Sequence, residues 1–221
     1  MFRSGLYLFS LMAENAIIMY DCTYRDKVGF NYLMQGNTKR QRRHDPERKE
    51  RIMSMAYDVI AKNGVAGVTL RKIADMAEVS LGSMTYHFSG KDELLYTVFS
   101  RFAEKGGEFA RGRLSQAETT AQAIHILAEA LTDGEWANRN NLAVLYEFYS
   151  LAAREPSYRP ILTAWSETVR KSLERLLSPE KARAFDVCLE GILLQNFLNP
   201  AGGLSSAEII HLLESIYFGR V

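Results

Sequence analysis

The chain has 221 residues, of which 47% are hydrophobic and 24% charged, and its formal net charge is +1. These values are those of an ordinary globular protein with one large or two small domains, and the small net charge excludes a protein that coats nucleic acid over its whole surface. Its two cysteines, Cys22 and Cys188, form neither a metal-binding nor a redox motif, which favours a reducing, cytoplasmic location.

Residues 1–36 are expected to lie outside the folded part of the protein. The apolar run from Leu6 to Ala13 is similar to the start of a signal peptide. Glu14 interrupts this run well before the roughly 20 residues that a membrane-spanning helix needs. We therefore expect a non-fold extension, for which Met34 is an alternative start. A membrane tether formed by residues 1–20 is kept as an alternative hypothesis.

Positive charge is concentrated in the next part of the chain. Residues 37–95 carry 11 Lys and Arg against 8 Asp and Glu, whereas residues 96–221 carry 13 against 15. This small, local excess favours a limited contact with phosphates by one domain.

The first helix is predicted to begin at Asp45-Pro46, an N-cap residue followed by proline at the first helical position. Asn63-Gly64 is the corresponding end signal. Apolar residues recur between them at helical spacing, namely Ile52, Met55, Ala56, Val59 and Ile60. The pattern predicts one amphipathic helix with a single core-facing stripe.

The stretch from Thr69 to Leu95 predicts two short helices and the start of a third. Thr69 is a suitable N-cap for a helix over about Leu70 to Ala77, and Ser80 for a second over about Leu81 to His87. Glu78-Val79 forms the turn between them, and Ser89 with Asp92 is a capping-box pattern for the next helix. Two helices joined by so short a turn form a helix-turn-helix, over about residues 69–88.

The residues around the second short helix fit contact with DNA. Its exposed face carries small and hydroxyl side chains, and Gly82 costs helix stability that close approach to a DNA backbone could offset. A basic arm in front of such a unit can also reach phosphates or a neighbouring groove; a solvated charged segment is the alternative. The predicted DNA-binding residues are Thr69, Arg71, Ser80, Leu81, Gly82, Ser83, Thr85, Tyr86, His87, Lys91, Arg42 and Arg43.

These positions carry a family resemblance. T-x-R-x-I-A-x-x-A-x-V-S-x-G-x-x-x-Y-H-F-x-x-K-x-x-L, starting at Thr69, resembles the N-terminal signature of the TetR/AcrR family of bacterial repressors. With the first helix the resemblance covers about residues 46–100. Glu78 stands where the family usually has glycine, which predicts a different or strained turn. Thr85 stands where many relatives have a second tyrosine.

The resemblance implies an all-α protein with an N-terminal three-helix DNA-binding domain, residues 37–100, and a C-terminal helical bundle, residues 101–221, for effector binding and dimerisation. The linking helix is predicted to run from about Gly90 to Gly106-Gly107, where adjacent glycines favour a hinge. Five further helical segments are predicted at about 120–131, 136–154, 157–177, 179–198 and 205–218.

Aromatic side chains are frequent in the C-terminal half. Most are expected to be core residues, but Tyr, Trp and His also carry polar groups of the kind that line ligand pockets. Following the family's arrangement, we assign the effector pocket to His125, Tyr146, Tyr149 and Trp165, and the dimer interface to Leu173, Leu177, Leu189 and Leu193 on the segments 157–177 and 179–198.

Catalysis finds no support in the sequence. The histidines are scattered, and neither a nucleophile elbow nor a glycine-rich phosphate loop is present, so no enzyme activity, metal or cofactor is expected. The predicted function is a homodimeric repressor that binds a palindromic DNA operator and is released by a small-molecule effector. A helical-bundle enzyme or carrier is the alternative from another class.

Overall fold

The computed structural model describes residues 45–219, and this part of the chain is helical, with no strand among the described residues. Residues 1–36, with Met34, and the predicted DNA contacts Arg42 and Arg43 lie outside the described residues. Pro46–Val221 form one compact unit. The prediction of an all-α fold is confirmed.

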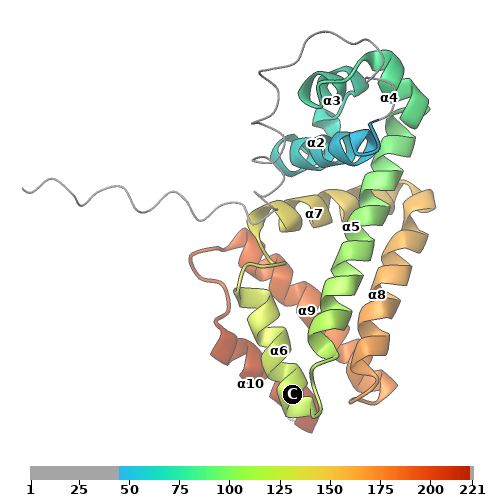
Figure 1. Ribbon diagram of the computed structural model, residues 1–221. Coiled ribbons are helices and arrows are strands. Elements are labelled where there is room, and N and C mark those ends of the chain that lie inside the picture. The colour runs from blue at the N-terminus through green and yellow to red at the C-terminus, as the bar shows by residue number, and fades with distance from the viewer. Residues whose placement is uncertain (1–44, 220–221) are drawn as a thin grey trace, which may run out of the picture. The chain divides into compact units, whose positions relative to one another are not determined.

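Three helices at the start of this unit make the predicted helix-turn-helix arrangement (Figure 1). They are α2 (Arg48–Asn63), α3 (Leu70–Met76) and α4 (Leu81–His87), with a short 3-10 turn, η2 (Val65–Gly67), between the first two. Helix α2 begins two residues after the predicted Pro46 and ends at the predicted Asn63. Of its predicted core stripe, Ile52, Ala56, Val59 and Ile60 are buried and Met55 is partly buried, and the helix packs against α7, α5 and α3.

Helix α5 (Lys91–Leu114) links the two halves of the unit as one unbroken helix. The prediction that it ends at about Gly106-Gly107 is therefore wrong. Both glycines are buried, and a Cβ atom at Gly106 would lie 2.6–2.8 Å from the rings of Trp136 and Trp165. The glycines allow close packing of neighbouring side chains on α5, which explains their presence better than helix breaking.

The remaining helices are α6 (Thr120–Thr132), α7 (Arg139–Arg154), α8 (Arg159–Leu173), α9 (Pro179–Leu198) and α10 (Ser206–Phe218), with a 3-10 turn, η3 (Pro156–Tyr158), before α8. Figure 1 shows α5 and α8 running side by side, and this is the most extensive helix pair in the unit. Capping boxes begin α6 at Thr119 with Gln122 and α10 at Ser205 with Glu208.

Two predicted segments begin later than expected. Trp136 was predicted to open a helix, but residues 133–138 are non-helical and α7 starts after Asn138, whose side chain accepts a hydrogen bond from the Asn141 N–H at 2.9 Å. A cap formed by Asn138 leaves Trp136 on an irregular connection. The segment predicted at 157–177 likewise divides into η3 and α8, and its last four residues are not helical.

The described residues have two apolar cores. One core joins α2, α3 and α4 to the first part of α5 and to α7, and it includes Phe88, Phe99 and Phe148. The other joins the end of α5 to α6, α8, α9 and α10 around Leu173 and Phe185. The helix-turn-helix thus shares its core with α7 instead of having a separate one.

Candidate nucleic-acid interface

The two short helices are capped as the sequence predicts. The Thr69 hydroxyl accepts a hydrogen bond from the Lys72 N–H at 3.2 Å, and the Ser80 hydroxyl accepts one from the Ser83 N–H at 3.1 Å. These bonds satisfy N–H groups that a helix start leaves without a partner, so they fix where α3 and α4 begin.

The turn between α3 and α4 contains a left-handed residue. Glu78 has a φ of 54°, and the Val79 N–H donates to the Ala74 carbonyl at 2.9 Å while the Glu78 N–H donates to the Asp75 carbonyl at 3.3 Å. This pair of bonds is the Schellman end of a helix, which glycine usually occupies. The expected strain at Glu78 is confirmed, because a side chain costs free energy at this φ.

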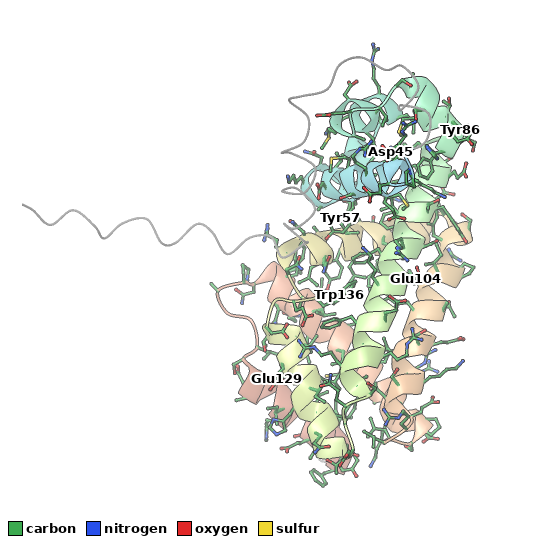
Figure 2. All side chains as sticks on the ribbon, in the orientation of Figure 1. Asp45, Tyr57, Tyr86, Glu104, Glu129 and Trp136 are labelled. Atoms are coloured by element: carbon green, nitrogen blue, oxygen red, sulfur yellow. The ribbon has the colours of Figure 1, made fainter. Side chains whose placement is uncertain are left out.

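Helix α4 presents a face that none of the described residues covers. Tyr86 is 85% exposed and Leu81 is 51% exposed, and Figure 2 shows Tyr86 at the outside of this helix. A Cβ atom on Gly82 would meet only the Ser80 hydroxyl, at 4.0 Å. Within residues 45–219, no contact therefore requires glycine here, which supports an external reason for it.

The other predicted DNA contacts on and around α4 differ in their exposure and in their contacts within the protein. Thr85 is exposed, with its hydroxyl donating to the Gly82 carbonyl at 3.1 Å, and Arg71 is exposed on α3. The Ser83 hydroxyl accepts a bond from Arg48 of α2 at 3.2 Å. His87 is half-buried, with its ring edge-on to Tyr86 at a centroid distance of 5.1 Å.

Lys91 has a structural contact that the sequence did not indicate. Its Nζ donates to the Val65 carbonyl at 2.9 Å, while the Val65 N–H donates to the Glu147 carboxylate of α7 at 2.8 Å. An ammonium group has three donors, so Lys91 can hold the connection after α2 and still contact a phosphate.

The capping box predicted from Ser89 and Asp92 is not formed at the start of α5. Glu93, and not Asp92, accepts hydrogen bonds from the Ser89 N–H and hydroxyl, each at 2.7 Å. The pKa of the Glu93 carboxyl is lowered, first by the hydroxyl bond from Ser89 and then by its N–H bond. The helix starts at Lys91, one residue later than predicted, and its N-cap, Gly90, has no side-chain cap, so Glu93 bonds the residue before the N-cap.

Of the four residues assigned to the effector pocket, Trp165, Tyr146 and Tyr149 pack against the same apolar core and His125 does not. Trp165 of α8 lies among aromatic rings of α5, whereas His125 is exposed on α6, where it lines a depression with Gln122 and Glu129. Tyr146 and Tyr149 of α7 form an edge-on pair with ring centroids 6.1 Å apart.

This tyrosine pair faces α9 and is partly buried. The Tyr149 hydroxyl donates to the Glu190 carboxylate at 2.9 Å, while the Tyr146 hydroxyl is buried without a hydrogen-bond partner. Burial, and then the charge of Glu190, raises the pKa of Tyr146 to about 12. Both tyrosines therefore stay protonated at neutral pH, and Tyr149 is the one whose hydroxyl donates a hydrogen bond.

The leucines assigned to the dimer interface lie mostly inside the protomer. Leu173 is 1% exposed, Leu177 and Leu189 are each 7% exposed, and Leu193 is half-buried. Side chains packed in their own core leave little surface for a partner. The exposed apolar residues on α9 are others, Val187, Leu194 and Leu198. Their 3–4 spacing with Ala184 and Gly191 is the sequence signal that would have indicated them.

Several other polar residues were missed by the sequence analysis. The Tyr57 hydroxyl of α2 donates to the Asn141 side-chain oxygen of α7 at 2.5 Å, and Glu147 holds the Val65 N–H. Both pairs lie more than 80 positions apart in the sequence, and neither carries a local pattern.

Comparison with known proteins agrees with this geometry. The family model described as "Bacterial regulatory proteins, tetR family" matches residues 52–98, and the one described as "Tetracyclin repressor-like, C-terminal domain" matches residues 115–216. The chain is 24% identical over 171 residues to the nicotine-responsive transcriptional repressor HdnoR of Paenarthrobacter nicotinovorans, covering 70% of this chain and 86% of the relative.

Two solved structures resemble the chain more closely in sequence. The transcriptional regulator SCO7518 of Streptomyces coelicolor A3(2) is 34% identical, with a TM-score of 0.71 over 77% of this chain and 98% of that one. The multidrug binding protein EbrR, solved with ethidium, is 31% identical, with a TM-score of 0.67 over 78% of this chain and 99% of that one. The chain therefore belongs to the TetR family of transcriptional regulators.

Proposed function

We propose that this regulator is a homodimeric repressor that binds a palindromic DNA operator through α4 and is released by a small molecule. The observation that carries the proposal is the outer face of α4, where the exposed Tyr86 and Leu81 adjoin a glycine with open space in front of it. A short helix with its N-terminal end free to approach base edges is suited to the major groove.

Some groups around α4 are placed to contact bases, and others are placed to bind phosphates. Thr85 and the backbone at Gly82 lie on the exposed face, where hydroxyl and amide groups can reach bases. Tyr86 and Lys91 are placed at the end of α4 and the start of α5, where they can bind phosphates. We propose that Arg42 and Arg43, in the basic arm before the first helix, make further phosphate contacts.

A second copy of the chain is the partner that the exposed face of α9 fits. Ala184, Val187, Gly191, Leu194 and Leu198 are all exposed and follow a 3–4 spacing along one side of this helix. Such a stripe packs against an equivalent stripe in a symmetric helix pair. A twofold dimer would present two α4 helices to two half-sites about one helical turn of DNA apart.

Release by a small molecule is supported by the relatives. HdnoR is described as nicotine-responsive, and EbrR as a multidrug binding protein in complex with ethidium. A helical-bundle enzyme or carrier is the competing reading. A membrane-tethered regulator would need residues 1–20, and among the described residues no helix is long and apolar enough to cross a membrane.

The test is selection of bound duplexes from random DNA, followed by genome-wide mapping of bound sites. We expect the selected duplexes to contain an inverted repeat. The protein should retain these duplexes at low salt and release them as the salt concentration rises. Tyr86→Ala should weaken retention, and Phe218→Ala, at an exposed aromatic side chain of α10, is the control that should not. Leu194→Asp should give a monomer with weak affinity for the full repeat. Equal retention of all sequences, or none, would contradict the proposal.

A further inference from the structure

Five residues form an aromatic slot, which we call the Trp136 slot. Phe102, Gly106 and Phe109 of α5 and Trp165 of α8 surround the indole of Trp136. Trp136 stacks on Phe102 and Phe109, with centroid distances of 5.1 and 6.0 Å and interplanar angles of 29° and 24°. Trp165 meets it edge-on at 5.9 Å and 82°. A flat ring is thus held on its face and at its edge.

Gly106 shapes the floor of the slot. A Cβ atom here would lie 2.7 Å from Trp136 and 2.6 Å from Trp165, distances that atoms do not tolerate. Glycine costs about 1 kcal/mol in a helix interior relative to alanine. The three atoms nearest to this Cβ position all belong to the two indoles, so glycine lets the flat rings lie against the α5 backbone.

Trp136 enters the slot from outside the helices. It lies in the non-helical segment 133–138, which ionic contacts fasten to α5: Arg113 pairs with Asp133 at 2.5 Å and with Glu135. These contacts are partly exposed to solvent, so each contributes little stability. Because residues 133–138 belong to no helix, departure of the indole would not require a helix to unfold. Phe102 and Trp165 belong to helices and remain as walls.

We propose that the Trp136 slot is the effector site and that its ligand is a planar aromatic compound, which takes the place of the Trp136 indole. The inference rests on the proposed small-molecule release and names its ligand class. Ring faces and a ring edge select a flat aromatic ligand, since such pairs gain free energy beyond simple burial. Trp136 acts as an internal competitor that closes the empty site.

The same tryptophan is linked to the DNA-binding half by hydrogen bonds. Its carbonyl accepts from the Asn141 side-chain amide at 2.8 Å, and the Asn141 oxygen accepts from the Tyr57 hydroxyl at 2.5 Å. Asn141 is 2% exposed, so the bond has little competition from water. Figure 2 labels the two residues at the ends of this series of hydrogen bonds, Tyr57 on α2 and Trp136 below α7. Displacing Trp136 therefore alters a contact that positions α2.

The first test measures binding and displacement with 2-naphthol, a flat two-ring probe. Decahydro-2-naphthol, which has the same carbon count but puckered rings, is the control ligand. The full chain is labelled with 5-fluorotryptophan, which gives two fluorine resonances because Trp136 and Trp165 are the chain's two tryptophans. We expect 2-naphthol to move the Trp136 resonance to the position of exposed fluoroindole, and the puckered control to leave it. An unmoved Trp136 resonance with 2-naphthol bound would overturn the proposal.

The second test removes the competitor. Trp136→Ala should bind 2-naphthol about tenfold more tightly in calorimetry, if the natural chain vacates the slot about one-tenth of the time. Adding Gly106→Ala to that variant should abolish the gain, because the methyl group occupies the floor. Glu214→Ala, exposed on α10, is the control and should change nothing. The proposal would be overturned if Trp136→Ala bound 2-naphthol more weakly than the natural chain, or if neither protein bound it.

The third test follows the link to DNA. Tyr57→Phe removes one hydroxyl and should leave 2-naphthol affinity unchanged, while more 2-naphthol is needed to release the selected duplex. Equal release would overturn the role of this link. A duplex released by other compounds without movement of Trp136 would contradict this inference alone, whereas a chain that retains no duplex would contradict the proposed function and leave the binding tests valid.

Discussion

Glu78 is the described residue where local sequence and local structure conflict most. A side chain at φ 54° costs about 1–2 kcal/mol, and glycine there avoids this cost at the expense of some chain entropy. Glu78→Gly should therefore raise the free energy of unfolding by about 0.5–1 kcal/mol, measured by urea denaturation. Glu78→Ala removes the charge but keeps the Cβ atom, so it should not raise it. A gain of the same size in both variants would assign the effect to charge instead of strain.

Lys91 combines an internal hydrogen bond with a proposed phosphate contact. Lys91→Ala should weaken binding to all duplexes alike and reduce the log–log salt slope by about one unit. Loss of the bond to the Val65 carbonyl should also lower unfolding stability by about 1 kcal/mol. Lys171→Ala, exposed on α8, should leave the salt slope unchanged. A changed preference among operators would show that Lys91 reads bases.

At the level of single helices, the adjacent glycines of α5 were predicted to form a hinge and instead lie inside an unbroken helix. Gly112 offers a matched comparison, since a Cβ atom there meets nothing within 4 Å. Gly112→Ala should stabilise the protein by up to about 1 kcal/mol. Gly106→Ala should destabilise it by about 1–3 kcal/mol through overpacking. Thermal unfolding of both variants tests whether Gly106 is required by packing. Stabilisation by Gly106→Ala would mean that the site has room for a methyl group.

The elements that sequence predicted well are those fixed by neighbouring residues. Thr69 and Ser80 cap helices as expected, because a cap depends on residues three positions away. The sequence predicts a helix that begins at Trp136, but the Asn138 cap starts α7 at Arg139. The burial of Leu173 and Leu189 could not be predicted, since it depends on which helices pack together.

On the scale of the whole unit, the helix-turn-helix and the C-terminal helices cannot move independently without cost. Helix α7 shares a core with α2 and α5, and its Glu147 accepts the Val65 N–H between α2 and α3. The carboxylate lies so close to Gly64 that a Cβ atom there would come within 2.8 Å of it. A change in the position of α7 is therefore transmitted to the start of the DNA-binding helices, through packing as well as hydrogen bonds.

This connection leads to a quantitative prediction about effector and operator. An effector that prefers the arrangement unable to bind DNA shifts the population by its difference in affinity and no more. Family-type release needs a coupling of roughly 1–3 kcal/mol, or about 5–150-fold. By reciprocity, saturating operator must weaken effector binding by that same factor. Quenching of Trp136 and Trp165 fluorescence can report effector affinity with and without operator, with a scrambled duplex as control. Equal affinities in the two titrations would leave a DNA-binding protein but not a repressor released by its ligand, because a ligand that binds both arrangements equally shifts neither.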